Sequence, residues 1–225
     1  MTLRVGGLTR LTTIDFPGRL AAVVFCQGCP WRCGYCHNPE LLDASQPGTL
    51  AWADVLGFLH QRRGLLDGVV FSGGEPLAQS ALPAALQQMR DMGFATALHT
   101  GGMYPERLAA ALPLLDWVGL DVKAPWAQIP AITGVAGSGA KVRASLALLL
   151  ESGVAHEVRS TWHPGLYPLA DLQALGQELA ALGLCDWVLQ PCDDPRAPGS
   201  AAAARQALAG ITPGQGGWPA LRVRG

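Results

Sequence analysis

The chain has 225 residues, enough for one α/β domain with a sizeable core, and no change in composition marks a second domain. Its formal net charge is −1 and its Lys and Arg residues are scattered, which argues against a nucleic-acid-binding surface. The sequence has no apolar run as long as a signal peptide or a membrane span, so we expect a cytoplasmic protein that does not bind a membrane.

Short apolar runs rich in Val, Leu and Ala alternate along the chain with stretches of helical spacing. The predicted strands are Leu20–Cys26, Gly68–Ser72, Phe94–His99, Trp117–Asp121, His156–Thr161 and Trp187–Gln190. The predicted helices are Ala51–Arg63, Ala78–Met92, Pro105–Ala111, Ala140–Ser152 and Leu169–Leu182. Because helices separate the strands, we expect a parallel sheet with both faces covered. This pattern fits either a doubly wound sheet or an open barrel.

We expect a single domain over residues 1–225. Residues 1–19 are interpreted as an N-terminal extension with a turn at Pro17-Gly18, residues 20–191 as the core, and residues 192–225 as a C-terminal segment.

Clusters of reactive or small residues follow or end the apolar runs. They read CPWRCGYCHNP, SGGEP, HTGG, DVKAP, STWHPG and QPCDD in chain order. In parallel α/β folds the carboxyl ends of the strands form the ligand-binding face. The sequence therefore predicts that these loops converge on one site.

The first cluster contains three of the six cysteines, Cys29, Cys33 and Cys36, with C-x3-C-x2-C spacing. In a reducing compartment such a group indicates a metal site and not a disulfide framework. Thiolates suit iron–sulfur clusters and zinc, but a structural zinc site takes four protein ligands. A zinc site that includes His37 is disfavoured, because His37 directly follows Cys36. Three cysteines instead suit a cubane cluster with one open iron.

This cysteine loop, with Tyr35 before its last cysteine, is followed one strand later by Ser72-Gly73-Gly74-Glu75-Pro76. Together the two motifs resemble those of the radical S-adenosylmethionine (SAM) superfamily. The ending CHNP is similar to that of glycyl-radical-enzyme activases, above all the anaerobic ribonucleoside-triphosphate reductase activating proteins. The resemblance covers about Val5 to Pro191. It implies an α/β fold that forms an open, partial (β/α)6 barrel with mostly parallel strands.

The resemblance implies that Cys29, Cys33 and Cys36 hold a [4Fe–4S] cluster whose open iron binds the amino and carboxylate groups of SAM. An electron from the reduced cluster then cleaves SAM to methionine and a 5′-deoxyadenosyl radical. Gly73 and Gly74 would let the backbone approach the methionine end of SAM, since glycine has no Cβ. Glu75 would accept the ammonium group.

Asp121-Val122-Lys123 matches the D-[LIV]-K motif of the activases, whose acid and lysine serve SAM and the radical site. Lys123 is therefore a candidate catalytic residue. The alternative is an ordinary ion pair at a strand end. Arg159 lies within a predicted strand, and it would either bind the SAM carboxylate with two hydrogen bonds or form a structural salt bridge.

Further SAM contacts follow from the resemblance. Tyr35 would lie near the adenine, Asn38 beside SAM or the cluster, and Thr100 at the end of the third strand. Activases of the pyruvate formate-lyase kind carry Asp-Thr there, as part of a monovalent-cation site, whereas this chain has His99-Thr100. An imidazole is a poor ligand for such an ion, so the resemblance does not extend to that site.

The remaining cysteines are assigned no chemistry. Cys26 is expected to pack in the core. Cys185 and Cys192 would hold a second cluster only with further ligands, and the sequence offers none. The loop at Trp162-His163-Pro164 is a candidate for the substrate mouth.

The sequence thus predicts an enzyme that takes a hydrogen atom from a glycine of a partner glycyl radical enzyme, with anaerobic ribonucleotide reductase as the expected partner and flavodoxin or ferredoxin as the electron donor. One alternative is a radical SAM enzyme of the 7-carboxy-7-deazaguanine synthase type, which acts on a pterin and binds Mg²⁺ near SAM. Another is a non-enzymatic iron–sulfur or zinc protein.

Overall fold

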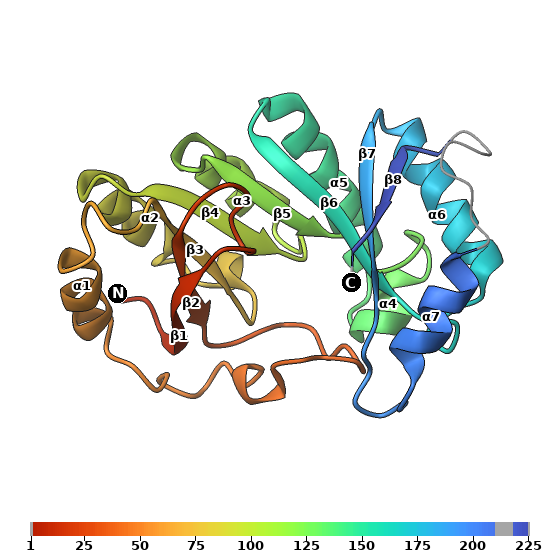
Figure 1. Ribbon diagram of the computed structural model, residues 1–225, viewed down its shortest axis with the longest axis horizontal. Coiled ribbons are helices and arrows are strands. Elements are labelled where there is room, and N and C mark those ends of the chain that lie inside the picture. The colour runs from red at the N-terminus through yellow and green to blue at the C-terminus, as the bar shows by residue number, and fades with distance from the viewer. Residues whose placement is uncertain (1, 210–217, 225) are drawn as a thin grey trace.

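A computed structural model describes residues 2–209 and 218–224. Its centre is one eight-stranded sheet in the order β1-β2-β3-β4-β5-β6-β7-β8 (Figure 1). The strands are β1 (Val5–Thr12), β2 (Ala21–Cys26), β3 (Gly68–Gly73), β4 (Ala95–Thr100), β5 (Trp117–Asp121), β6 (Ala155–Trp162), β7 (Asp186–Pro191) and β8 (Ala220–Val223). The pair β1–β2 is antiparallel, and every later pair is parallel.

Helices follow most of the parallel strands. They are α1 (Trp52–His60), α2 (Leu82–Asp91), α3 (Pro105–Ala111), α4 (Ile129–Thr133), α5 (Ser138–Ser152), α6 (Leu169–Ala181) and α7 (Ser200–Leu208), with the 3-10 turns η1 (Pro39–Leu41), η2 (Pro76–Ala78) and η3 (Leu112–Leu114). No helix in these described stretches is long and apolar enough to cross a membrane.

The strand order decides between the two architectures that the sequence left open. A doubly wound sheet reverses its strand order at a switch point, whereas here each strand lies beside its predecessor. With right-handed crossovers, this order places the helices on one face and curls the sheet (Figure 1). Within the described residues β1 and β8 do not pair with each other, so the barrel is open. The predicted open barrel is confirmed, and the doubly wound alternative is wrong.

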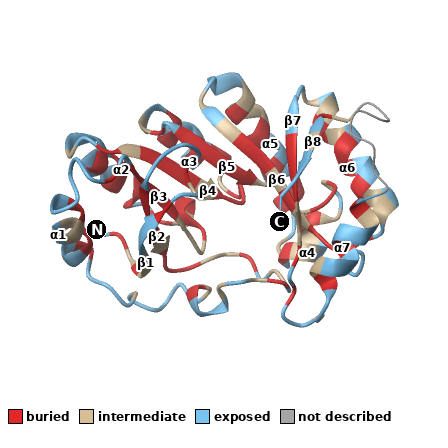
Figure 2. Ribbon diagram, viewed as in Figure 1, coloured by how far each residue is buried: buried red, intermediate tan, exposed pale blue. Residues whose placement is uncertain are grey.

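The main core lies between the sheet and the surrounding helices. Phe71, Leu98, Leu120 and Val158 of adjacent strands are fully buried there, and β2 to β5 are buried along most of their length (Figure 2). Leu146 of α5 packs into the same cluster. This burial explains why these inner strands are mostly apolar.

A smaller core fills the inner face of the barrel. The loop between β1 and β2 places Phe16 there, 3% exposed, against Val23, Val70 and Ala97. The Phe16 ring also lies 6.2 Å from the ring of Trp117, centroid to centroid. The N-terminal segment therefore contributes a core residue to the barrel.

Replacing Phe16 with alanine should lower the free energy of unfolding by roughly 3–5 kcal/mol, because it leaves a cavity under the inner face. Chemical denaturation measures the change. Ile14→Ala is the matched control from the same loop; Ile14 is 80% exposed, and its replacement should change stability by less than about 0.5 kcal/mol. Equal effects of the two variants would contradict the placement of Phe16 in the core.

The six predicted strands are present as β2 to β7, and each end lies within one residue of the prediction. The predicted helices correspond to α1, α2, α3, α5 and α6. Helix α3 has the predicted bounds, α5 starts two residues earlier, and the other three are shorter. Residues 1–19 differ from the prediction, because Val5–Thr12 is a strand and not only an extension. Strand β8 and helices α4 and α7 also lie outside the predicted set. Both added strands are at sheet edges, where apolar patterning is weak. The division into a single domain stays a prediction.

Candidate functional site

One pocket lies at the carboxyl ends of the parallel strands. It collects side chains and backbone from the loop after β2 and from the ends of β3, β4, β5 and β6. The predicted site residues that line it are Cys29, Cys33, Tyr35, Cys36, Asn38, Gly73, Gly74, Glu75, Thr100, Asp121, Lys123 and Arg159. The structure therefore brings every predicted site residue together.

The cysteine loop leaves β2 and runs across the open side of the barrel toward the end of β7 (Figure 1). Backbone hydrogen bonds hold it at both ends. Gly28 N donates to Leu41 O at 2.8 Å, and Arg32 N donates to Thr133 O at the end of α4 at 2.8 Å. These bonds fix the loop over the pocket, so that all three cysteines line it.

The three cysteines are partly buried and free of disulfides. Burial raises the pKa of Cys29 to about 12 and also raises that of Cys33. Such thiols are poor free nucleophiles, but a bound metal supplies the positive charge that deprotonates them. Three thiols that line one pocket are a soft donor set, which suits an iron–sulfur cluster.

Gly73 and Gly74 are required by close backbone packing. Gly73 has φ of 105°, and a Cβ there would lie 2.5 Å from the backbone nitrogen of Cys26. A Cβ on Gly74 would overlap the carbonyl oxygen of Gly28. The two glycines thus seat the β3 loop against the start of the cysteine loop, and their backbone also faces the pocket.

Glu75 is a buried carboxylate, 3% exposed. It accepts hydrogen bonds from Thr100 Oγ1 at 2.7 Å, Leu77 N at 3.1 Å and Gly101 N at 2.9 Å. Burial raises its pKa, although these hydrogen bonds oppose the shift. Within the described residues no Lys, Arg or His forms an ion pair with Glu75. A buried carboxylate with donors but no cation fits a ligand ammonium group.

Asp121 connects two cations at the end of β5. Its Oδ1 lies 2.5 Å from Arg159 Nε, and its Oδ2 lies 3.7 Å from Lys123 Nζ. Burial opposes ionisation of Asp121, but the charges of Arg159 and Lys123 outweigh it and lower its pKa. The ion pairs that the sequence left as alternatives are present, and they lie inside the pocket. The pocket therefore gains one net positive charge from this group.

Lys123 is held between two aromatic rings of the cysteine loop. Its Nζ lies 5.8 Å from the Trp31 ring centroid and 5.7 Å from that of Tyr35. Trp31 is 3% exposed, and a Cβ on Gly101 would overlap its ring. Sequence reasoning missed Trp31 and Gly101, although both stand in motifs that it singled out. These contacts tie the cysteine loop to the ends of β4 and β5.

His99 lines the pocket where the resembling activases carry an aspartate. Its Nε2 lies 2.9 Å from the backbone oxygen of Asp15, so Nε2 carries the proton and donates. Its ring also packs edge-on against Trp117 at 5.5 Å. The side chain at this position is therefore held by the loop between β1 and β2 and by β5.

Burial, with the nearby charge of Arg159, lowers the pKa of His99 to about 4. On acidification His99 is protonated near pH 6.5 in the unfolded chain but only near pH 4 in the folded chain. Stability from His99 should be complete above pH 6.5 and fall toward pH 4, with a slope approaching about 1.4 kcal/mol per pH unit. We expect His99→Gln to flatten the stability profile in this range, measured by denaturation at each pH. His60→Gln is the control, and unchanged slope in the His99 variant would refute the prediction.

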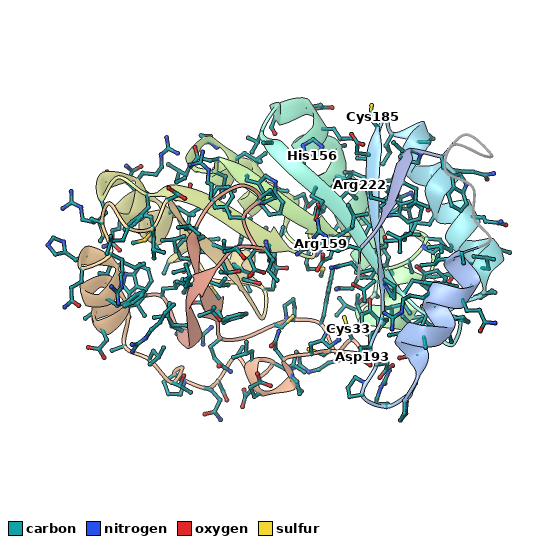
Figure 3. The ribbon with its side chains drawn as sticks, viewed as in Figure 1. Cys33, His156, Arg159, Cys185, Asp193 and Arg222 are labelled. Carbon is teal, nitrogen blue, oxygen red and sulfur yellow. The ribbon has the colours of Figure 1, made fainter. Side chains whose placement is uncertain are left out.

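Four other residues that the sequence analysis discussed lie away from the pocket lining. Cys26 is fully buried in the core, as expected. Cys185 is exposed, at the opposite end of β7 from Cys33 (Figure 3). The expectation that His163 lines the substrate mouth is wrong, because His163 is 6% exposed and its Nε2 lies 3.5 Å from Asp194 Oδ2. Cys192 is buried beside this pair.

Sequence comparisons agree with the chemistry of the pocket. The family model for the radical SAM superfamily matches residues 23–168. A putative glycyl-radical enzyme activating enzyme of Methanocaldococcus jannaschii is 26% identical over 186 residues, which cover 79% of this chain and 75% of that protein. The pyruvate formate-lyase-activating enzyme of Clostridium pasteurianum is 34% identical over 125 residues, 53% of this chain and 52% of the relative. The chain therefore spans about half the length of this second relative.

Solved structures share the fold at low sequence identity. QueE from Escherichia coli superposes with a TM-score of 0.61 at 19% identity, covering 100% of this chain and 94% of that one. SuiB from Streptococcus suis gives a TM-score of 0.65 at 12% identity, covering 88% of this chain and 47% of that one. A domain of pyruvate-formate lyase-activating enzyme from Bacteroides vulgatus gives 0.53 at 18% identity, covering 70% and 99%.

Proposed function

The chain belongs to the radical SAM superfamily, whose members use a [4Fe–4S] cluster and SAM. From this premise we propose that the protein is an activase for a glycyl radical enzyme. In this reaction the 5′-deoxyadenosyl radical takes a hydrogen atom from a glycine Cα. The products are 5′-deoxyadenosine and a glycyl radical in the partner.

One observation carries the proposal. The three cysteines, the Gly-Gly-Glu loop and the Asp121–Lys123–Arg159 group line one pocket at the edge of an open barrel. Similarity over 79% of the chain to a putative glycyl-radical enzyme activating enzyme supports the choice of reaction. An open barrel suits a macromolecular substrate, because a loop of another protein can enter it from the side.

The pocket residues take the following roles in the proposal. Cys29, Cys33 and Cys36 hold the cluster, which when bound and reduced supplies the electron that cleaves SAM. Glu75 accepts the SAM ammonium, since it is a buried carboxylate that forms no ion pair with any residue that the structure describes. Arg159 has its Nε bound to Asp121 and retains its other nitrogens for the SAM carboxylate.

The remaining pocket residues orient the ligand. Tyr35, Asn38, Gly73 and Gly74 all line the pocket. In the proposal Tyr35 lies near the adenine, Asn38 beside SAM or the cluster, and the backbone of the two glycines near the methionine end. Thr100 lines the pocket and also donates a hydrogen bond to Glu75. Lys123 places its ammonium over Trp31 and beside Asp121, where it serves the radical site.

We propose anaerobic ribonucleoside-triphosphate reductase as the partner and flavodoxin or ferredoxin as the electron donor. The support is the CHNP ending of the cysteine loop and its resemblance to that subgroup. The test is to reconstitute the protein anaerobically with iron and sulfide, reduce it, and add SAM and the organism's own anaerobic reductase. A glycyl EPR doublet that requires SAM is expected. Formation of 5′-deoxyadenosine without any glycyl signal would overturn the activase assignment.

A pterin-acting enzyme of the 7-carboxy-7-deazaguanine synthase type is the second candidate, because a radical SAM structure, QueE, aligns over the full chain. Such an enzyme would bind Mg²⁺ near SAM. Of the two acids among the described pocket-lining residues, Asp121 is already paired with Arg159 and Lys123. The similarity to a putative glycyl-radical enzyme activating enzyme over 79% of the chain favours the activase. Pterin turnover that depends on SAM and Mg²⁺ would reverse the order.

A further inference from the structure

The loop after β7 docks on the cysteine loop. Cys33 and Asp193 lie near each other at this junction, although they come from different ends of the sequence (Figure 3). His37 Nε2 lies 3.1 Å from the backbone oxygen of Asp193. The guanidinium of Arg196 covers Gly34, since a Cβ added at Gly34 would lie 2.6 Å from Nη2 and 2.7 Å from Cζ of Arg196.

Arg196 is held in this position by a buried carboxylate. Asp194 is 3% exposed and accepts hydrogen bonds from Arg196 Nε at 3.1 Å, Nη2 at 2.8 Å and the backbone N at 2.8 Å. Ser200 Oγ accepts from Asp194 N at 2.9 Å and donates to Cys192 O at 2.8 Å. His163 lies on the other side of the carboxylate. The loop after β7 is therefore built around Asp194, and it presents the guanidinium outward to the cysteine loop.

We propose that Arg196 is a positioning residue for the iron–sulfur cluster: its guanidinium, fixed by Asp194 against Gly34, holds the segment between Cys33 and Cys36 and favours the reduced cluster. The inference rests on the proposed function, because it requires the cluster at Cys29, Cys33 and Cys36. A cubane with three thiolate ligands is an anion that becomes more negative on reduction. Charge and hydrogen bonds next to the ligands tune its potential.

The glycine at position 34 is what allows this contact. Its φ is not positive, so alanine fits the backbone there, and the added methyl group meets only the end of the flexible Arg196 side chain. Gly34→Ala should therefore push the guanidinium away without unfolding the loop. Arg196→Gln removes the charge directly. Because it also takes a partner from the buried Asp194, it should be less stable than the wild type, and Gly34→Ala tests the same contact with the Arg196 side chain still present.

The experiment is an EPR-monitored redox titration of the full-length, anaerobically reconstituted protein. At the midpoint potential of the wild type, we expect Arg196→Gln to lower the reduced-to-oxidised ratio about threefold, which is about 30 mV for a one-electron couple. Gly34→Ala should shift the ratio in the same direction. The double variant should shift it no further than Arg196→Gln alone, because both changes remove one contact. Arg205→Gln, which removes an exposed charge of α7, is the matched control and should leave the potential unchanged.

The inference would be overturned by an unchanged potential in Arg196→Gln, or by a double variant whose shift equals the sum of the two single shifts. As long as the wild type assembles a cluster, neither result affects the proposed function. If the wild type itself assembled no cluster, both would fall together. Loss of 5′-deoxyadenosine formation with an unchanged potential would also count against this role of Arg196.

Discussion

Replacing Cys33 with alanine should abolish cluster assembly and reductive cleavage of SAM. Cys33 lies in the middle of the ligand set and lines the pocket, and a cubane that loses one of three protein ligands has two open irons in place of one. We expect 5′-deoxyadenosine formation to fall by at least about three orders of magnitude. Without the cluster, no group next to SAM supplies the electron that cleaves it. The measurements are iron and sulfide content, EPR of the reduced protein, and product quantification.

Cys185→Ala is the control for this variant. Cys185 is exposed, and it lies at the opposite end of β7 from Cys33 (Figure 3). It should keep the wild-type iron content and activity. A Cys33→Ala protein that retains a SAM-responsive cluster would contradict the ligand assignment, and equal losses in both variants would show that general thiol loss and not ligation is being measured.

Replacing Glu75 with glutamine should weaken SAM binding by about 10- to 100-fold. The variant removes the buried negative charge that fits the SAM ammonium, and an ion pair or charged hydrogen bond of this kind contributes about 1.5–3 kcal/mol. Equilibrium dialysis with oxidised, cluster-loaded protein measures SAM affinity apart from turnover. A dissociation constant within twofold of the wild type would exclude Glu75 as the ammonium acceptor.

The same variant should also be less stable. The new side-chain amide must direct its NH₂ at one of the backbone N–H groups that now donate to the carboxylate, from Leu77 or Gly101. One buried donor is then left unsatisfied, at a cost of about 1–3 kcal/mol. Glu151→Gln, on the exposed surface of α5, is the matched control, and it should change neither SAM affinity nor the melting temperature.

The active pocket could be predicted from the sequence because its residues stand at the ends of apolar runs. In a parallel sheet all such ends meet at one edge, whatever the order of the strands. Cys29, Glu75, Asp121 and Arg159 therefore converge without any knowledge of their contacts. The same rule failed for His163, which follows β6 but turns into the protein to meet Asp194.

The edge elements could not be predicted in the same way. Strand β1 is exposed along much of its length and contains Gly6-Gly7, so its pattern does not alternate clearly between apolar and polar residues. Its pairing with β2 is nevertheless close and antiparallel. Phe16 looked like part of a surface extension, and only the folded chain shows it under the inner face of the barrel.

The sequence by itself determined the class of chemistry, since the spacing of Cys29, Cys33 and Cys36 and the Gly-Gly-Glu turn are local features that persist whatever surrounds them. Only the tertiary structure decided how the charges are shared. Arg159 binds Asp121 across adjacent strands, Glu75 forms no ion pair within residues 2–209 and 218–224, and Arg196 covers Gly34. Such pairings join residues far apart in the chain. Strand register and burial decide which side chains meet, and neither can be read from a local sequence pattern.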